Sequence, residues 1–159
     1  MAIVKRYWKE AFASILAAEL VGLLGFLAAG DTTAFYRSLA RPPGAAPSWL
    51  FGVVWPILYV LMGFAAFLVY REPAARRPQY DALKVYFIQL AVNVVWCIVF
   101  FRLHLLWGGF LVLLALLALV LVTVARFTRV NRTAGGLLIP YFIWILYAAY
   151  LNLGIALLN

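Results

Sequence analysis

The sequence has little of what enzymes commonly use for catalysis or metal binding. Its 159 residues include one cysteine, one histidine and five acidic residues. The single cysteine, Cys97, excludes an internal disulfide, and we expect it to be a buried structural thiol because it lies in an apolar run. One histidine and one cysteine are too few for a cluster of metal ligands.

Nucleophiles and phosphate-binding loops are also scarce. The three serines are Ser14, Ser38 and Ser48, and none lies in a nucleophile-elbow context. No glycine-rich loop of the phosphate-cradling kind is present. We therefore expect neither a conventional hydrolase nor a kinase, and no obligatory cofactor.

Charged residues make up only 11% of the chain, whereas 68% of the residues are hydrophobic and the mean hydropathy is +1.03. A soluble domain has roughly a quarter of its residues charged. The net charge of +8 comes from basic residues that lie singly or in pairs between apolar runs. That pattern is typical of membrane topology signals and not of nucleic-acid binding. The composition predicts an integral membrane protein with no nucleic-acid partner.

Five apolar segments have about the 20 residues that a helix needs to cross the hydrocarbon layer. They are residues 11–29, 49–70, 80–101, 107–127 and 135–158. A β-barrel is disfavoured, because the runs are long and lack strict alternation. We expect an all-α bundle of five transmembrane helices forming one domain over residues 1–159. Glu19 and the length of the first segment favour a retained helix over a cleaved signal peptide.

The basic residues predict the orientation of the chain in the membrane. Ten of them lie on one side of the expected bundle, whereas only Arg37, Arg41 and Arg102 lie on the other. The ten are Lys5, Arg6, Lys9, Arg71, Arg76, Arg77, Lys84, Arg126, Arg129 and Arg132. The positive-inside rule then places the N-terminus in the cytoplasm.

Two helix faces carry polar or aromatic side chains that should point into the bundle. Gln89, Asn93 and Trp96 share one face of the third segment. Buried amides require hydrogen-bond partners, so this face either binds neighbouring helices or anchors a ligand. The other face, on the fifth segment, carries Tyr141, Trp144, Ala148, Leu151 and Asn152. It would accommodate either a flat guest or a neighbouring helix.

Two single residues, Glu19 and His104, have more than one interpretation, and two prolines should affect helix geometry. Glu19 could pair with a polar group, bind a proton or cation, or lie near a water-filled crevice. His104 is either an interfacial residue or an axial haem ligand. Pro140 should bend the fifth segment, whereas Pro56 should resemble an ordinary first-turn proline.

Small residues recur at four-residue spacing on the first segment. Ala18 and Gly22 form one such pair, and Gly25 and Ala29 form another. Pairs of this kind let two helices approach closely. They serve either dimerisation or packing within one bundle.

Residues 41–55, RPPGAAPSWLFGVVW, form an unusually proline-rich and aromatic connection between the first two segments. Together with residues further along the chain, it resembles the translocator protein family (TspO/MBR, the tryptophan-rich sensory proteins). The matching residues are Phe35, Tyr36, Leu39, Arg41, Pro42, Pro47, Trp49, Trp55, Leu58, Tyr59 and Met62; Gln89, Leu90, Ala91, Asn93, Trp96, Phe100 and Phe101; and Leu137, Leu138, Pro140, Tyr141, Trp144, Leu151 and Asn152.

The resemblance implies a five-helix bundle in a bacterial cell membrane, usually a homodimer, with the first loop as a lid over a ligand cavity. Family members bind porphyrins such as protoporphyrin IX and haem, and in animals cholesterol and synthetic benzodiazepine-site ligands. Carried over by position, the cavity lining comprises Phe51, Trp55, Asn93, Trp96, Trp107, Trp144, Ala148 and Leu151. Either Arg37 or Arg41 could meet a porphyrin propionate.

The implied function is tetrapyrrole binding and sensing that influences tetrapyrrole metabolism or stress regulation. Light-dependent porphyrin degradation, tetrapyrrole transport and a ligand-free assembly role are the alternatives. Gly44 occupies the position of the family's lid tryptophan, which weakens the case for degradation. Leu153 replaces the tyrosine of the family's cholesterol motif, so sterol recognition is not expected.

Overall fold

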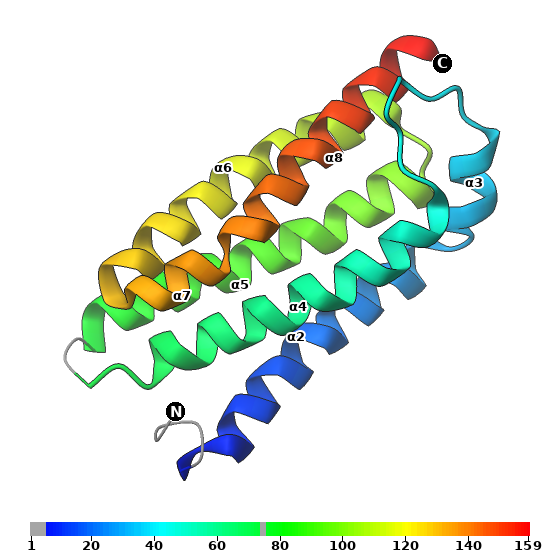
Figure 1. Ribbon diagram of the computed structural model, residues 1–159. Helices are drawn as coiled ribbons and strands as arrows, with labels where there is room; N and C mark the ends of the chain where they lie inside the picture. The colour runs from blue at the N-terminus through cyan, green and yellow to red at the C-terminus, as the bar shows by residue number, and fades with distance from the viewer. Residues whose placement is uncertain (1–5, 74–75) are drawn as a thin grey trace.

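The computed structural model describes residues 6–73 and 76–159, which form an elongated bundle of helices (Figure 1). Lys5 lies outside these residues. No strand occurs in the described part of the chain. The helices are α2 (Trp8–Ala29), α3 (Thr32–Ser38), α4 (Ser48–Tyr70), α5 (Arg76–Cys97), the π-helical turn η1 (Ile98–Arg102), α6 (Leu106–Val130), α7 (Arg132–Leu137) and α8 (Ile139–Leu158).

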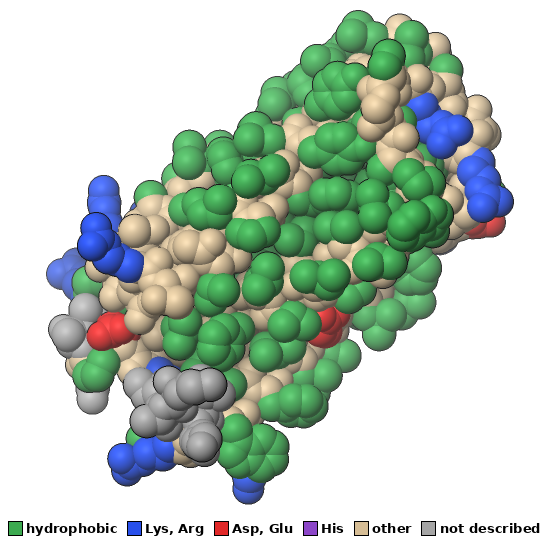
Figure 2. Space-filling view, viewed as in Figure 1, with side chains coloured by type: hydrophobic (Ala, Val, Ile, Leu, Met, Phe, Trp, Pro, Cys, Tyr) green, Lys and Arg blue, Asp and Glu red, His purple; other side chains and the backbone are tan. Residues whose placement is uncertain are grey.

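The five predicted spans are confirmed. Residues 8–29, 48–70, 77–102, 106–130 and 132–158 are helical, and each segment is long and apolar enough to cross a membrane. Hydrophobic side chains cover the middle of the face shown in Figure 2, whereas lysines and arginines gather at its two ends. Since this surface matches a bilayer in which only the ends meet water, the chain is a multi-pass membrane protein.

The two prolines act differently. The fifth span is interrupted at Leu138, where α7 ends, and Pro140 lies in the first turn of α8. The predicted distortion near Pro140 is confirmed, because proline cannot donate the backbone hydrogen bond that would continue the helix. The expectation for Pro56 is wrong: α4 begins at Ser48, so Pro56 lies inside the helix and not in its first turn.

Small residues bring α2 close to α4. A Cβ atom added to Gly22 would lie within 3 Å of the Tyr59 ring. A Cβ atom added to Gly63 would lie 2.5 Å from the Cα of Ile15. The Ser14 hydroxyl also donates a hydrogen bond of 2.7 Å to the carbonyl oxygen of Gly63. The first small pair on α2 therefore packs within the bundle, as one of the two interpretations predicted.

The other half of the bundle is built around α6, which packs against α5 and α8. In contrast, the backbones of α4 and α8 approach each other closely at few positions. Aromatic side chains fill the space between these two helices: the rings of Phe51 and Trp144 are 5.6 Å apart, and those of Trp55 and Tyr141 are 6.3 Å apart. The candidate site lies next to this aromatic layer.

Candidate functional site

A buried polar network joins three helices in the middle of the bundle. The Tyr141 hydroxyl donates to the Oε1 atom of Gln89 at 2.8 Å and accepts from the Nδ2 atom of Asn93 at 3.0 Å. The Tyr59 hydroxyl lies 3.5 Å from the Oδ1 atom of Asn93. The amides of Gln89 and Asn93 are each 1% exposed, so these bonds satisfy groups that would otherwise be unpaired in an apolar interior. Both amides therefore join helices, which is one of their two predicted roles.

One helical turn closer to the connector, Trp96 makes the next polar contact. Its indole N–H donates to the Oδ1 atom of Asn152 on α8 at 3.2 Å. Both side chains are buried, with 5% and 2% of their surface exposed. Trp96 also stacks on Phe100, with ring centroids 6.0 Å apart. This contact places Asn152 at the wall of a cavity.

The cavity lies between α3, η1 and the adjoining parts of α4, α5 and α8, and has a volume of about 60 Å³. It is next to the connector, which we define as residues 39–47 between α3 and α4. The cavity is lined by Thr32, Thr33, Tyr36, Ser48, Phe51, Trp96, Phe100, Phe101, Ala148, Leu151, Asn152 and Ile155. A cavity that holds benzene has about 150 Å³, so this one is too small for a planar guest in the observed conformation.

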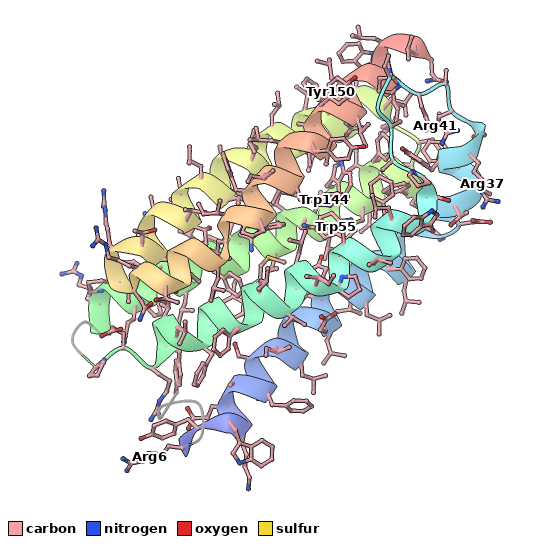
Figure 3. The ribbon with its side chains drawn as sticks, in the orientation of Figure 1. Arg6, Arg37, Arg41, Trp55, Trp144 and Tyr150 are labelled. Atoms are coloured by element: carbon pink, nitrogen blue, oxygen red, sulfur yellow. The ribbon has the colours of Figure 1, made fainter. Side chains whose placement is uncertain are left out.

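Of the eight predicted lining residues, Phe51, Trp96, Ala148 and Leu151 meet at this cavity. Trp55 and Trp144 lie behind its wall. The Trp55 ring is 6.2 Å from that of Trp96, and the Trp144 ring packs against Phe51. Figure 3 shows Trp55 on α4 and Trp144 on α8 near the middle of the bundle. Both tryptophans are half-buried and belong to the aromatic layer beside the cavity, not to its lining.

The other two predicted residues lie away from the cavity. Asn93 belongs to the polar network. Trp107 is 53% exposed and packs edge-on against Phe110 on the same helix, 6.4 Å away. Trp107 was assigned to the predicted site from the family resemblance. In this structure its ring lies on the outer surface of α6.

The cavity also has lining residues that the predicted site did not include. Phe100 and Phe101 follow α5 in η1, where the amide of Leu103 bonds the carbonyl of Ile98 at 2.9 Å, five residues earlier. This wider turn brings both rings toward α3, where they meet Phe35 at 5.9 and 6.3 Å. A π-helical turn often occurs at functional sites, but hydrophobic periodicity does not reveal it.

The connector is held to the end of α8 by side-chain hydrogen bonds. The Tyr147 hydroxyl donates to the carbonyl of Gly44 at 2.8 Å and accepts from the amide of Ala46 at 2.9 Å. The Tyr150 hydroxyl donates to the carbonyl of Pro43 at 2.7 Å, and the side chain of Asn159 bonds both backbone groups of Ala40. We call these contacts, which join α8 to the connector, the connector latch.

Backbone geometry explains why Pro43 and Gly44 occur in the connector. The amide of Ala45 bonds the carbonyl of Pro42 at 3.2 Å, and Gly44 has φ of 77°. Pro43 followed by a glycine with positive φ is the arrangement of a type II turn. A Cβ atom on Gly44 would have free space around it, so the backbone angle and not crowding favours glycine there. A tryptophan at this position would strain the turn.

Tyr36 closes the cavity from the side of α3. Its hydroxyl donates to the carbonyl of Ala46 at 2.9 Å. Burial raises the pKa of Tyr36, the nearby Tyr147 hydroxyl adds to this rise, and Arg41 partly offsets it. Tyr36 therefore stays protonated and able to donate at neutral pH. The Arg41 guanidinium lies 5.4 Å from the centre of the Tyr36 ring, which places a positive charge beside the cavity.

His104 and Glu19 lie away from this cavity. His104 is exposed and stacks on Phe35, with ring centroids 4.0 Å apart, at the edge of a wide open depression on the outer side of α3. This surface location agrees with the interfacial interpretation. Glu19 is half-buried on α2. No group of three or more potential metal-binding side chains occurs among the described residues.

Comparison with known families agrees with this architecture. The model of the TspO/MBR family matches residues 13–158. The chain belongs to the TspO/MBR family. The match covers the connector, four spans in full and the first span from residue 13 onward, so the family fold accounts for nearly the whole protein.

Relatives in this family come from bacteria, archaea and animals. The chain is 38% identical to protein CrtK of Rhodobacter capsulatus over 126 residues, which is 79% of each chain. It is 34% identical to the tryptophan-rich protein TspO of Archaeoglobus fulgidus over 148 residues, or 92% of this chain and 95% of the relative. The human translocator protein is 29% identical over 147 residues, or 91% of this chain and 87% of the relative.

Proposed function

We propose that this protein binds tetrapyrroles such as protoporphyrin IX and haem, and similar flat apolar ligands, beneath the connector. Binding would serve a sensory role that influences tetrapyrrole metabolism or stress regulation. The observation that carries the proposal is the convergence of Phe51, Trp96, Ala148 and Leu151 from three spans on one cavity. Aromatic and aliphatic walls suit a planar apolar ring system, and family membership supports the same ligand class.

The closed cavity must enlarge before a porphyrin enters. Drug-sized ligands occupy pockets of about 300–1,000 Å³, several times the volume observed. The connector is the part best placed to move, because it adjoins the cavity through the Tyr36–Ala46 hydrogen bond and is held mainly by side-chain hydrogen bonds at the bundle surface. Its prolines lower the entropy lost when it closes again over a guest.

We propose that the connector end faces outward, in a bacterial cell membrane with the N-terminus in the cytoplasm. Figure 3 shows Arg37 and Arg41 at the connector end and Arg6 at the other. Arg41, beside Tyr36, could then form a charge-assisted hydrogen bond with a propionate that projects toward water. We also propose a homodimer, with a contact surface other than the face of α2 that Gly22 presents to Tyr59.

A porphyrin titration with a cavity-filling variant tests the proposal. Wild-type protein in detergent should show saturable quenching of tryptophan fluorescence by protoporphyrin IX. Ala148→Phe should lose this quenching, because Ala148 is 5% exposed and the added ring would fill the cavity. Leu146→Phe on the same helix is the matched control, since Leu146 is 44% exposed on the outer surface.

Two results would contradict ligand binding at this cavity. One is a wild-type protein, shown by circular dichroism to be folded, whose fluorescence does not respond to protoporphyrin IX. The other is equal affinity in wild type and Ala148→Phe. Illumination of the complex tests the degradation alternative, for which a bilin-like product above a dark control is required. Accumulation of porphyrin in proteoliposomes tests transport.

A further inference from the structure

The cavity contains an unpaired hydrogen-bond donor. Asn152 is 2% exposed, and its Oδ1 atom accepts the indole N–H of Trp96 at 3.2 Å. Its Nδ2 atom is buried and has no partner among the residues that the structure describes. Since Asn152 lines the cavity, this amide N–H₂ group lies at the cavity wall, where neighbouring side chains cover it.

The Trp96 contact fixes which end of the amide is free. An indole N–H can only donate, so the Asn152 oxygen must face Trp96 and the nitrogen must face the other way. Leaving a buried donor unpaired is costly, and native structures generally pair such groups. The arrangement is therefore typical of a group whose partner arrives with a ligand.

The chemistry around the cavity defines that partner. Among the described residues, the two buried side-chain polar atoms without a partner are both donors, Asn152 Nδ2 and Trp144 Nε1. The Trp144 ring packs against Phe51, which lines the cavity. The lining includes four hydroxyl residues, Thr32, Thr33, Tyr36 and Ser48, and no carboxylate. The cavity lining thus has one spare donor, Asn152 Nδ2, and no negative charge to repel an anionic oxygen.

We propose that Asn152 is a specificity residue, which donates a hydrogen bond from Nδ2 to a carboxylate or carbonyl oxygen at the edge of the bound guest. This inference rests on the proposed tetrapyrrole function and adds to it a requirement for an acceptor oxygen. A porphyrin carrying propionates satisfies the requirement. A porphyrin with only alkyl substituents does not.

The test compares two porphyrins on two proteins. Protoporphyrin IX has two propionates, whereas etioporphyrin I has only alkyl groups at its edge. Both are titrated in the same detergent micelles against wild type and Asn152→Leu, with tryptophan quenching as the measurement. We expect Asn152→Leu to weaken protoporphyrin IX binding by about tenfold, since a hydrogen bond to a charged group is lost. Etioporphyrin I binding should stay within about twofold of wild type.

A second background separates recognition from damage to the cavity wall. Asn152→Leu alone leaves the Trp96 N–H unpaired. The same substitution is therefore repeated in Trp96→Phe, where neither side of the internal hydrogen bond remains. The selective loss of protoporphyrin IX binding should persist there. Circular dichroism and thermal unfolding show whether each variant is folded.

The outcomes distinguish this inference from the function on which it rests. If wild type binds neither porphyrin, the tetrapyrrole function fails and the inference falls with it. If wild type binds both and Asn152→Leu weakens both equally in the two backgrounds, Asn152 only supports the fold. If both affinities are unchanged, the donor binds nothing more than a water molecule. The last two results overturn the inference and leave the tetrapyrrole function standing.

Discussion

Replacing Gly63 by alanine should separate α2 from α4. The added Cβ would lie 2.5 Å from the Cα of Ile15 and 2.8 Å from the carbonyl oxygen of Ser14. Both are backbone atoms, so no side-chain rotation relieves the overlap. To reach normal contact distances, the two helix backbones must move apart by about 1 Å.

The cost has two parts. Overpacking of a well-packed interior costs about 1–3 kcal/mol. The separation also stretches the hydrogen bond from the Ser14 hydroxyl to the Gly63 carbonyl, and an interhelical bond of this kind contributes about 0.6 kcal/mol in a membrane protein. Gly63→Ala should therefore lower the free energy of unfolding by about 2–4 kcal/mol.

Gly52→Ala on the same helix is the matched control. A Cβ added at Gly52 meets no atom within 4 Å, so alanine should be neutral or slightly stabilising there. The free energy of unfolding is measured by titrating the purified proteins from mild detergent into sodium dodecyl sulfate, with circular dichroism as the readout. Equal unfolding midpoints for the two variants would refute the close α2–α4 packing on which this reasoning depends.

Three further predictions concern the latch, the polar network and the mouth of the cavity. Tyr147→Phe removes two connector hydrogen bonds, so porphyrin association followed by stopped-flow fluorescence should accelerate; an unchanged rate would count against connector opening. Tyr141→Phe leaves the buried amides of Gln89 and Asn93 without their shared partner and should lower the unfolding free energy by about 1–2 kcal/mol in the same detergent titration. Arg41→Gln should weaken protoporphyrin IX binding by about threefold and leave etioporphyrin I binding unchanged, because an exposed ion pair contributes little; equal effects on both porphyrins would exclude a propionate contact.

The sequence was sufficient to predict the five spans. Long apolar runs have few alternative structures in a bilayer, since every backbone hydrogen bond must be satisfied within the segment. The inward faces could also be predicted, because the amides of Gln89 and Asn93 would be costly in contact with lipid. The start of the second span was predicted to within one residue, and this start already places Pro56 beyond the first turn, so the first-turn interpretation of Pro56 did not follow from the predicted span.

The candidate site was predictable only in part, because facing residues are known only once helices are paired. Helical spacing placed Trp96 and Asn93 on one face, yet only Trp96 borders the cavity, while Asn93 bonds Tyr141. The two small-residue pairs on α2 could not reveal their partner helix. Nor could any sequence pattern show that the oxygen of Asn152 is occupied and its nitrogen is free, since that follows from the direction of one indole N–H.

The connector explains how a cavity too small for a porphyrin could still belong to a porphyrin-binding protein. Pro42 packs so closely on Gly154 of α8 that a Cβ atom added to Gly154 would lie 2.6 Å from the proline ring. The connector latch adds hydrogen bonds between the connector and the same helix. If the connector must open before a porphyrin binds, as proposed, stable closure makes the open form rare, and the apparent affinity falls in proportion to the open fraction. Each 1.4 kcal/mol of latch stability lowers that fraction by about tenfold. Substitutions that weaken the latch without touching the cavity wall should therefore strengthen apparent binding, whereas substitutions in the wall should weaken it.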